Sequence, residues 1–335
     1  MNKKLFTTLA VIFFSATLFA QNDIPVSFTI SPEFGLLYGQ ITENVWYVNS
    51  KKTTTQTTYT PTTRMSRLDW EMENAPYFGA AMNLTFKRRF SFDFSFSSAL
   101  SRENGAMEDF DWLNPVNPKW QNDPLDELTN YSVHKMLISD YTKVAFAFGY
   151  NFYPDKKENI RLTPTLGVQA QSFDFTGIGG YYLYKINNFN TLSFPQNAKV
   201  INYRQSYLAP FTGVSAWAYL FNFLDTGIDI NAIYSHRINA YDNHIQKNNT
   251  GEACYYKDEL QDVFILDAQL SVLCRITKHN KIGIKGGITF SPDSYGFTYY
   301  SAKSFDDLNK TPASELGGSS RLIFNFAVVY SFVID

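Results

Sequence analysis

The sequence has little charge, little cysteine and almost no long hydrophobic stretch. Charged residues make up 18% of the 335 residues, and the net charge is −2. A chain without a basic excess lacks the electrostatic footprint of a nucleic-acid-binding protein, so that class is excluded. After the first twenty residues, no run approaches the roughly 18 apolar residues that a transmembrane helix needs. The sequence therefore also excludes a helical membrane protein with several spans.

The sequence has only two cysteines, which offer no zinc pattern but could in principle form one disulfide. Cys254 lies in a predicted loop, and Cys274 lies deep in a strand pattern that begins near Val263. About eleven extended residues at ~3.3 Å each would separate the two by more than ~30 Å, whereas a disulfide needs Cα atoms within about 7 Å. We predict that both cysteines are free.

The one long apolar run stands at the N-terminus and resembles a secretory signal. Lys3 and Lys4 form a positive region, Leu5–Phe19 form an apolar core, and Ala20 is a small residue suited to cleavage. We expect residues 1–20 to be a signal peptide and residues 21–335 to form one exported domain.

Aromatic residues, in contrast, are abundant at 17% of the chain, and many recur with a period of two. One segment alternates Phe90, Phe92, Phe94 and Phe96 with Ser91, Asp93, Ser95 and Ser97. Such alternation predicts β-strands with one apolar and one polar face. We count ten such segments, which begin near Val26, Ser66, Phe90, Ile138, Ile160, Asn202, Leu224, Asp262, Ile282 and Ser320.

The connections between these segments alternate in length. Short turns are expected at 87–89, 154–159, 222–223 and 277–281, and long loops at 48–65, 101–137, 175–201, 236–261 and 292–319. An even strand number with this asymmetry is typical of bacterial outer-membrane barrels. We therefore predict an all-β, ten-stranded antiparallel transmembrane β-barrel with long extracellular loops. Several strands exceed the 9–11 residues that cross a bilayer, so the barrel should project above the membrane. A soluble β-sandwich is the alternative fold, but it does not explain the asymmetry.

Two polar pairs in the long loops could carry chemistry. Asp109 and Asp111 are two residues apart, so on an extended chain both carboxylates face one way and could hold a water or a cation. Asp242 and His244 have the same spacing, and a carboxylate beside an imidazole orients the ring for general-base work. Each pair alone is equally compatible with an ordinary solvated loop.

Other constellations predict no chemistry. Ser132 and His134 are neighbours, but no G-x-S-x-G elbow surrounds the serine. The segment Gly177–Gly180 is not followed by a helix or by the Lys-Ser/Thr of a phosphate-binding loop.

Several motifs, taken together and in order, resemble the omptin family of outer-membrane barrel proteases. They are Ser66–Trp70, Gly105–Trp112, Ser132 with His134, and Asp242 with His244. The resemblance runs from about Phe28 to the last strand. It implies an endopeptidase that activates water without a metal, a cofactor or a covalent intermediate. By motif, His244 would be the general base, Asp242 would orient it, and Asp109 and Asp111 would position the water and share its proton.

The resemblance also implies a substrate preference and a lipid partner. Omptins prefer basic residues at the cleavage site, and Glu43 matches one acid of the pocket before the scissile bond. A second acid would stand at position 240, where this chain has Ala240, and an acid of the following pocket is replaced by Asn130. We therefore expect protein or peptide substrates with a weaker or altered basic preference. Omptins also need lipopolysaccharide, but one family arginine is replaced by Ser206, which puts that requirement in question.

Two other functions stay open at this stage. A non-catalytic adhesin or binding barrel is suggested by Ala240, Asn130 and the threonine-rich stretch Lys51–Thr63. A passive porin is the third reading, and the bulky polar residues expected to fill a small barrel disfavour it.

Overall fold

The computed structural model describes residues 26–334 except 53–56, 101, 115–122, 125, 154–158, 222, 248–251 and 311–314. The predicted signal peptide and most of the turn predicted at 154–159 lie outside the described residues. No helix in the described part of the chain is long and apolar enough to cross a membrane.

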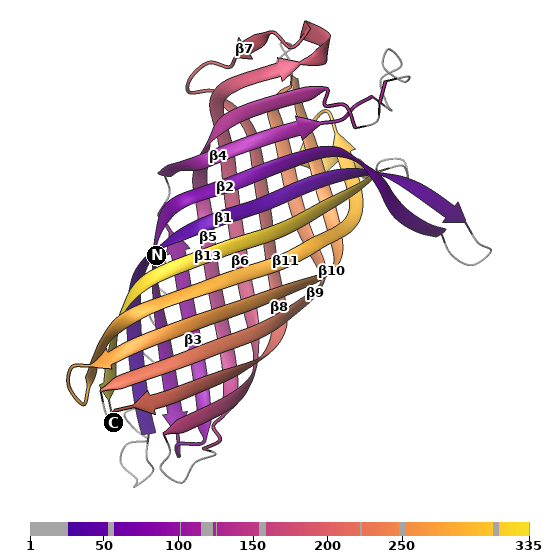
Figure 1. Cartoon of the computed structure of the whole chain (residues 1–335). Helices are drawn as coiled ribbons and strands as arrows, with labels where there is room; N and C mark the ends of the chain where they lie inside the picture. Colours follow the sequence, from indigo (N-terminus) through magenta and orange to yellow (C-terminus); the bar gives the residue numbers. More distant parts are fainter. Residues whose placement is uncertain are drawn as a thin grey trace.

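The described chain forms one antiparallel sheet that closes on itself (Figure 1). Its long strands are β1 (Val26–Lys52), β2 (Thr57–Phe86), β3 (Phe90–Ala99), β4 (Arg102–Asp111), β5 (Asn130–Tyr150), β6 (Ile160–Tyr184), β8 (Lys199–Leu220), β9 (Leu224–Lys247), β10 (Glu252–Arg275), β11 (Asn280–Ser301) and β13 (Glu315–Ile334). The short elements are η1 (Lys185–Asn187), β7 (Thr191–Ser193), η3 (Phe305–Asp307) and β12 (Asn309–Lys310).

Strands β3 and β4 occupy one position in the barrel wall, because both pair with β2 on one side and β5 on the other. Hydrogen bonds then run around ten wall positions and return from β13 to β1. The prediction of a ten-stranded antiparallel barrel is confirmed. Closure leaves no open edge at the ten wall positions, although the short strands β7 and β12 each pair on one side only.

The predicted loop boundaries are wrong, because most of the expected loops continue as strand. β5 begins at Asn130 rather than near residue 138, and β9 runs to Lys247 rather than ending near residue 235. The reason is physical. Above the bilayer the outer face meets water, so apolar alternation disappears while the hydrogen-bonded ladder continues. The wall strands are 20–30 residues long, with β3 and β4 counted as one strand. This is about twice the length that crosses a bilayer.

The barrel has a short-turn end and a long end. At the short-turn end, Arg89 N donates to Phe86 O at 3.0 Å, closing the predicted turn at 87–89 with positive φ at Lys87 and Arg88. The register places Val26 opposite Phe86, so the described start of the chain lies at this end too. At the other end, β1 and β2 extend as a hairpin past their neighbours (Figure 1).

An apolar belt surrounds the half of the barrel nearer the short turns. Every wall strand presents exposed large hydrophobic side chains there, including Phe34, Phe78, Phe92, Phe146, Leu166, Val214, Ile228, Leu270, Ile284 and Phe326. A belt of this kind is the lipid-facing surface of a membrane barrel. It accounts for much of the aromatic excess in the sequence.

Both cysteines are free, as predicted. They stand near opposite ends of the single extended strand β10, and Cys254 is buried while Cys274 is exposed.

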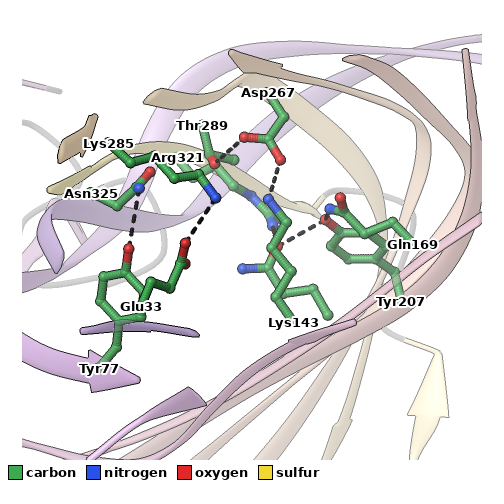
Figure 2. Close-up of polar contacts among 11 residues, drawn as sticks. Glu33, Tyr77, Lys143, Gln169, Tyr207, Asp267, Lys285, Thr289, Arg321 and Asn325 are labelled. Carbon is green, nitrogen blue, oxygen red and sulfur yellow. Dashed lines mark hydrogen bonds and ion pairs between the residues drawn. The ribbon is translucent and has the colours of Figure 1, made fainter. Parts of the chain in front are cut away.

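The lumen beside the belt is filled with paired polar groups (Figure 2). Lys143 forms an ion pair with Asp267, which also accepts a hydrogen bond from Thr289 Oγ1 at 3.1 Å. Lys285 Nζ lies 3.0 Å from Glu33 Oε2. These pairs line a cavity of about 350 Å³. Buried charges that are paired in this way are tolerated inside a barrel.

An apolar layer closes the lumen above the polar region. Trp70 stacks on Tyr203 with ring centroids 5.9 Å apart, and both side chains are fully buried. Phe173 and Phe175 stack beside them at 5.4 Å. Part of the aromatic excess is therefore internal, which the alternation alone did not predict. This layer forms the floor of the polar site described next.

Candidate active site

Asp242 and His244 lie near the upper end of β9 and form a hydrogen-bonded pair. Their spacing of two puts both side chains on one face of the strand, as predicted. Asp242 Oδ2 lies 2.7 Å from His244 Nε2. The Asp242 side chain is only 6% exposed and that of His244 is 28% exposed, so the carboxylate is held in the wall while the ring reaches the opening. Tyr256 packs edge-on against the ring at 5.6 Å.

Asp109 and Asp111 lie on β4, four wall positions away from β9 around the ring. Asp111 Oδ2 accepts a hydrogen bond from Asn130 Nδ2 at 3.1 Å. Asp109 Oδ1 is buried and has no hydrogen-bond partner among the described residues. Both charges reach His244 across the lumen. The structure thus brings together the two pairs that the sequence places more than 130 residues apart.

The electrostatics of this cluster favour bound protons. Burial lowers the pKa of His244, but the charge and hydrogen bond of Asp242, together with the charges of Asp109 and Asp111, outweigh it and raise that pKa to about 9. Burial raises the pKa of Asp109 well above its usual range, and the charges of Asp111 and Asp242 add to this effect, while His244 opposes it. The surrounding carboxylates thus favour the protonated form of His244, and burial beside Asp111 favours the protonated form of Asp109.

A bulge shapes the strand that carries the aspartate pair. Gly105 has φ +98°, and a Cβ at this position would lie 1.8 Å from the Glu71 carbonyl oxygen. The register of β4 against β5 shifts between Glu103 and Ala106 at the same place. Bulges that turn a strand beside a site are a common device for aiming side chains.

Ser132 and His134 stand on β5, behind the aspartate pair. Ser132 lies directly opposite Asp109 in the ladder. His134 Nδ1 donates to Gly179 O at 2.5 Å, because a carbonyl oxygen can only accept, and Nε2 then accepts from Ser132 Oγ at 2.9 Å. Burial lowers the pKa of His134, against the hydrogen bond to Gly179. This histidine is therefore neutral, and both side chains are only 3% exposed.

Glu43 on β1 joins the cluster from a third wall position. It is 3% exposed, and its Oε2 has no hydrogen-bond partner among the described residues. Burial raises the pKa of Glu43, and the charges of Asp242, Asp258 and Asp109 raise it further. The predicted site residues on β1, β4 and β9 are thus close enough for the charges of Asp242 and Asp109 to act on Glu43.

One further acid, Asp258 on β10, belongs to this cluster and was not predicted from the sequence. It is 3% exposed and accepts a hydrogen bond from Thr298 Oγ1 at 2.7 Å. Burial raises its pKa to about 7; the hydrogen bond from Thr298 opposes this, and the charge of Asp242 adds to it. Asp258 was assigned to a loop. The structure buries Cys254, Asp258 and Leu260 on one face of β10, and the consecutive charged residues 257–259 hid this period of two in the sequence.

Comparison with known proteins identifies the family of this barrel. Residues 24–313 match the model of the omptin family. The chain belongs to the omptin family of outer-membrane proteases.

Individual relatives agree with this assignment. The chain is 25% identical over 224 residues to the plasminogen activator of Yersinia pestis, covering 66% of this chain and 64% of that protein. It is 23% identical over 267 residues to protease 7 of Escherichia coli strain K12, covering 78% and 79%. The fold matches the crystal structure of the outer-membrane protease OmpT from Escherichia coli with a TM-score of 0.74 at 18% identity, covering 92% of this chain and 97% of that chain.

Proposed function

We propose that this omptin-family barrel is an endopeptidase that hydrolyses protein and peptide substrates at its long, extracellular end. The observation that carries the proposal is the Asp242–His244 pair, with 2.7 Å between Oδ2 and Nε2, whose ring lies within reach of the charges of Asp109 and Asp111. A general base held by a carboxylate, opposite acids that can position a water, is the arrangement needed to hydrolyse an amide without a covalent intermediate.

The reaction follows from the hydrogen bonds around His244. Its Nε2–H donates to Asp242, so Nδ1 is the nitrogen that accepts a proton. A water held between His244 and Asp109 gives one proton to Nδ1 while its oxygen attacks the scissile carbonyl carbon. The tetrahedral intermediate then expels the amine, which takes the proton from the imidazolium as the C–N bond breaks. Asp109 and Asp111 orient the water and share a proton, and Asp242 positions the ring.

Glu43 is proposed to contact the substrate rather than the water. Its buried Oε2 faces the pocket without a hydrogen-bond partner among the described residues, so a cationic side chain of the substrate would compensate its charge. Protein and peptide chains with a basic residue at the cleavage site are the expected substrates.

The outer wall above the apolar belt suits contact with anionic lipid headgroups, which we propose as a second partner. Arg204 lies over the Tyr241 ring at 4.9 Å, and Arg237 and Lys257 both contact Glu259. Activity measured with and without lipopolysaccharide in the detergent would test this contact. The proposed orientation places this wall and the site outside the cell, with residues 1–20 serving as the export signal.

Replacing the base tests the proposed activity directly. His244→Ala in the folded full-length barrel should lower kcat on quenched peptides with central Arg-Arg or Arg-Lys by about 10²- to 10⁴-fold, the usual contribution of general-base catalysis. His236→Ala is the matched control, because that ring lies outside the barrel with 85% of its side chain exposed. Wild-type turnover in His244→Ala, on peptides and on proteins, would refute the proposal.

A further inference from the structure

The residue Ala240 leaves a gap in the acidic wall of the pocket, and the neighbouring strand fills it. Asp258 on β10 stands directly opposite Ala240 on β9 in the antiparallel ladder. Residues that are directly opposite in such a ladder have Cβ atoms about 4.5–5.5 Å apart. The side chain of Asp258 can therefore occupy the region that a longer side chain at position 240 would reach. Asp258 is 3% exposed and points into the lumen, where Ala240 offers only a methyl group.

Gly317 on β13 makes room for this carboxylate. A Cβ at Gly317 would lie 2.1 Å from Asp258 Cγ, so the carboxylate occupies the space that any side chain there would need. Gly317 pairs with Val45 of β1, two residues along the strand from Glu43. Asp258 therefore reaches across the lumen face of β11 toward the strand that carries Glu43, and its charge acts on Glu43 directly.

The two acids form a buried pair without a cation. The ion pairs among the described residues include no lysine or arginine on Glu43 or Asp258, and Glu43 Oε2 is buried without a hydrogen-bond partner there. Two desolvated carboxylates, close enough for the charge of Asp258 to act on Glu43, are unfavourable until a cation joins them. A guanidinium can donate to both at once, whereas a neutral or acidic side chain leaves them uncompensated. The charges of Glu43 and Asp258 both act on the hydroxyl of Tyr203, so this ring lies close to the two acids. It forms an aromatic floor for a guanidinium.

We propose that Glu43 and Asp258 together bind the basic side chain that precedes the scissile bond, with Asp258 supplying the carboxylate that is absent at position 240. This inference rests on the proposed endopeptidase function and specifies its substrate. The sequence led us to expect a weakened preference for basic residues. We now expect the preference to be retained, because Asp258 of β10 supplies the carboxylate that β9 lacks.

The test compares peptides that differ only in the residue before the scissile bond, either arginine or its neutral isostere citrulline. In Asp258→Asn, the ratio of kcat/KM for arginine over citrulline should fall at least about tenfold, which corresponds to about 1.4 kcal/mol. Gly317→Ala should lower the same ratio, because the new methyl group displaces the carboxylate. The double variant Asp258→Asn with Ala240→Asp should restore it, an outcome that a merely structural role for Asp258 would not produce.

Asp262→Asn is the matched control. This aspartate lies on the same strand, but its side chain is 66% exposed, so the ratio should stay at the wild-type value. A binding measurement separates this inference from the proposed activity. It uses peptides in which the scissile amide is replaced by a methylene-amine link that cannot be hydrolysed. Fluorescence anisotropy then compares the binding of the arginine and citrulline peptides.

Each result decides one or both proposals. Cleavage with a ratio that is unchanged in Asp258→Asn overturns the inference and leaves the protease intact. Arginine-selective binding that needs Asp258, without cleavage of any peptide, overturns the proposed activity and keeps the pocket. Neither cleavage nor arginine-selective binding overturns both.

Discussion

At the scale of single residues, the protonation of His244 controls the proposed chemistry. Only a neutral imidazole accepts a proton from water, and the surrounding carboxylates raise the pKa of His244 to about 9. Since the folded pKa lies above neutrality, the active fraction is small at pH 7 and increases about tenfold for each pH unit until the pKa is reached. The same carboxylates that orient the base therefore also hold its proton.

The pH profile tests this directly. We expect kcat/KM to rise with pH through the neutral range and to level off near pH 9. Asp111→Asn removes one of the negative charges that raise the pKa, so its profile should rise at lower pH. His236→Ala should leave the inflection in place. A profile that is flat from pH 6 to 9, or an inflection that Asp111→Asn does not move, would contradict the assignment of His244 as the base.

Residue spacing predicted part of this site. The i, i+2 spacing of Asp109 with Asp111, and of Asp242 with His244, correctly placed each pair on one face of an extended chain. Spacing could not predict that the two pairs meet, because only ring closure brings β4 and β9 across from each other. Asp258 was missed for the same reason, since its partner Glu43 is more than 200 residues away.

At the scale of elements, the bulge in β4 is a feature sensitive to substitution. Gly105→Ala would place a methyl group 1.8 Å from the Glu71 carbonyl oxygen at a φ of +98°, so β4 must shift. We expect a cost of about 1–3 kcal/mol in unfolding free energy and a larger relative loss of kcat, because Asp109 moves from its position.

Urea unfolding in detergent micelles and peptide hydrolysis would measure the two effects of Gly105→Ala. Gly286→Ala is the control, because the nearest atom to a Cβ there is 3.6 Å away. Wild-type kcat in Gly105→Ala would show that the bulge does not aim the aspartate pair.

The extent of the strands shows where the period-two pattern no longer predicts secondary structure. Alternation located all ten wall strands through their lipid-facing halves, where apolar and polar faces differ most. The upper halves have water outside and a polar pocket inside, so their two faces no longer differ in hydropathy. As a result, the parts of β4, β9 and β10 that carry Asp109, Asp111, Asp242, His244 and Asp258 were predicted to be loops, and only Glu43 was placed on a strand.

At the scale of the whole molecule, the lumen is divided into a pocket, an aromatic floor and a polar lower region. Trp70, Tyr203, Phe173 and Phe175 are fully buried and stacked across it. This division disfavours the porin reading. Planar bilayers containing the purified barrel should therefore show no steady single-channel conductance. Regular conductance steps at low voltage would mean that the floor opens.

The sequence by itself determined the membrane-facing architecture, because lipid on one side and polar groups on the other impose a period of two on every spanning strand. It also contained the two carboxylate-bearing pairs, because local spacing sets which face a side chain takes. The tertiary structure decided which pairs meet, how far the strands extend above the membrane, and that Asp258 stands opposite Ala240. Those features depend on register and closure around a ring, and they join residues that no local pattern connects. Within this chain of low charge, the folded barrel gathers Asp242, Asp109 and Asp111 around His244.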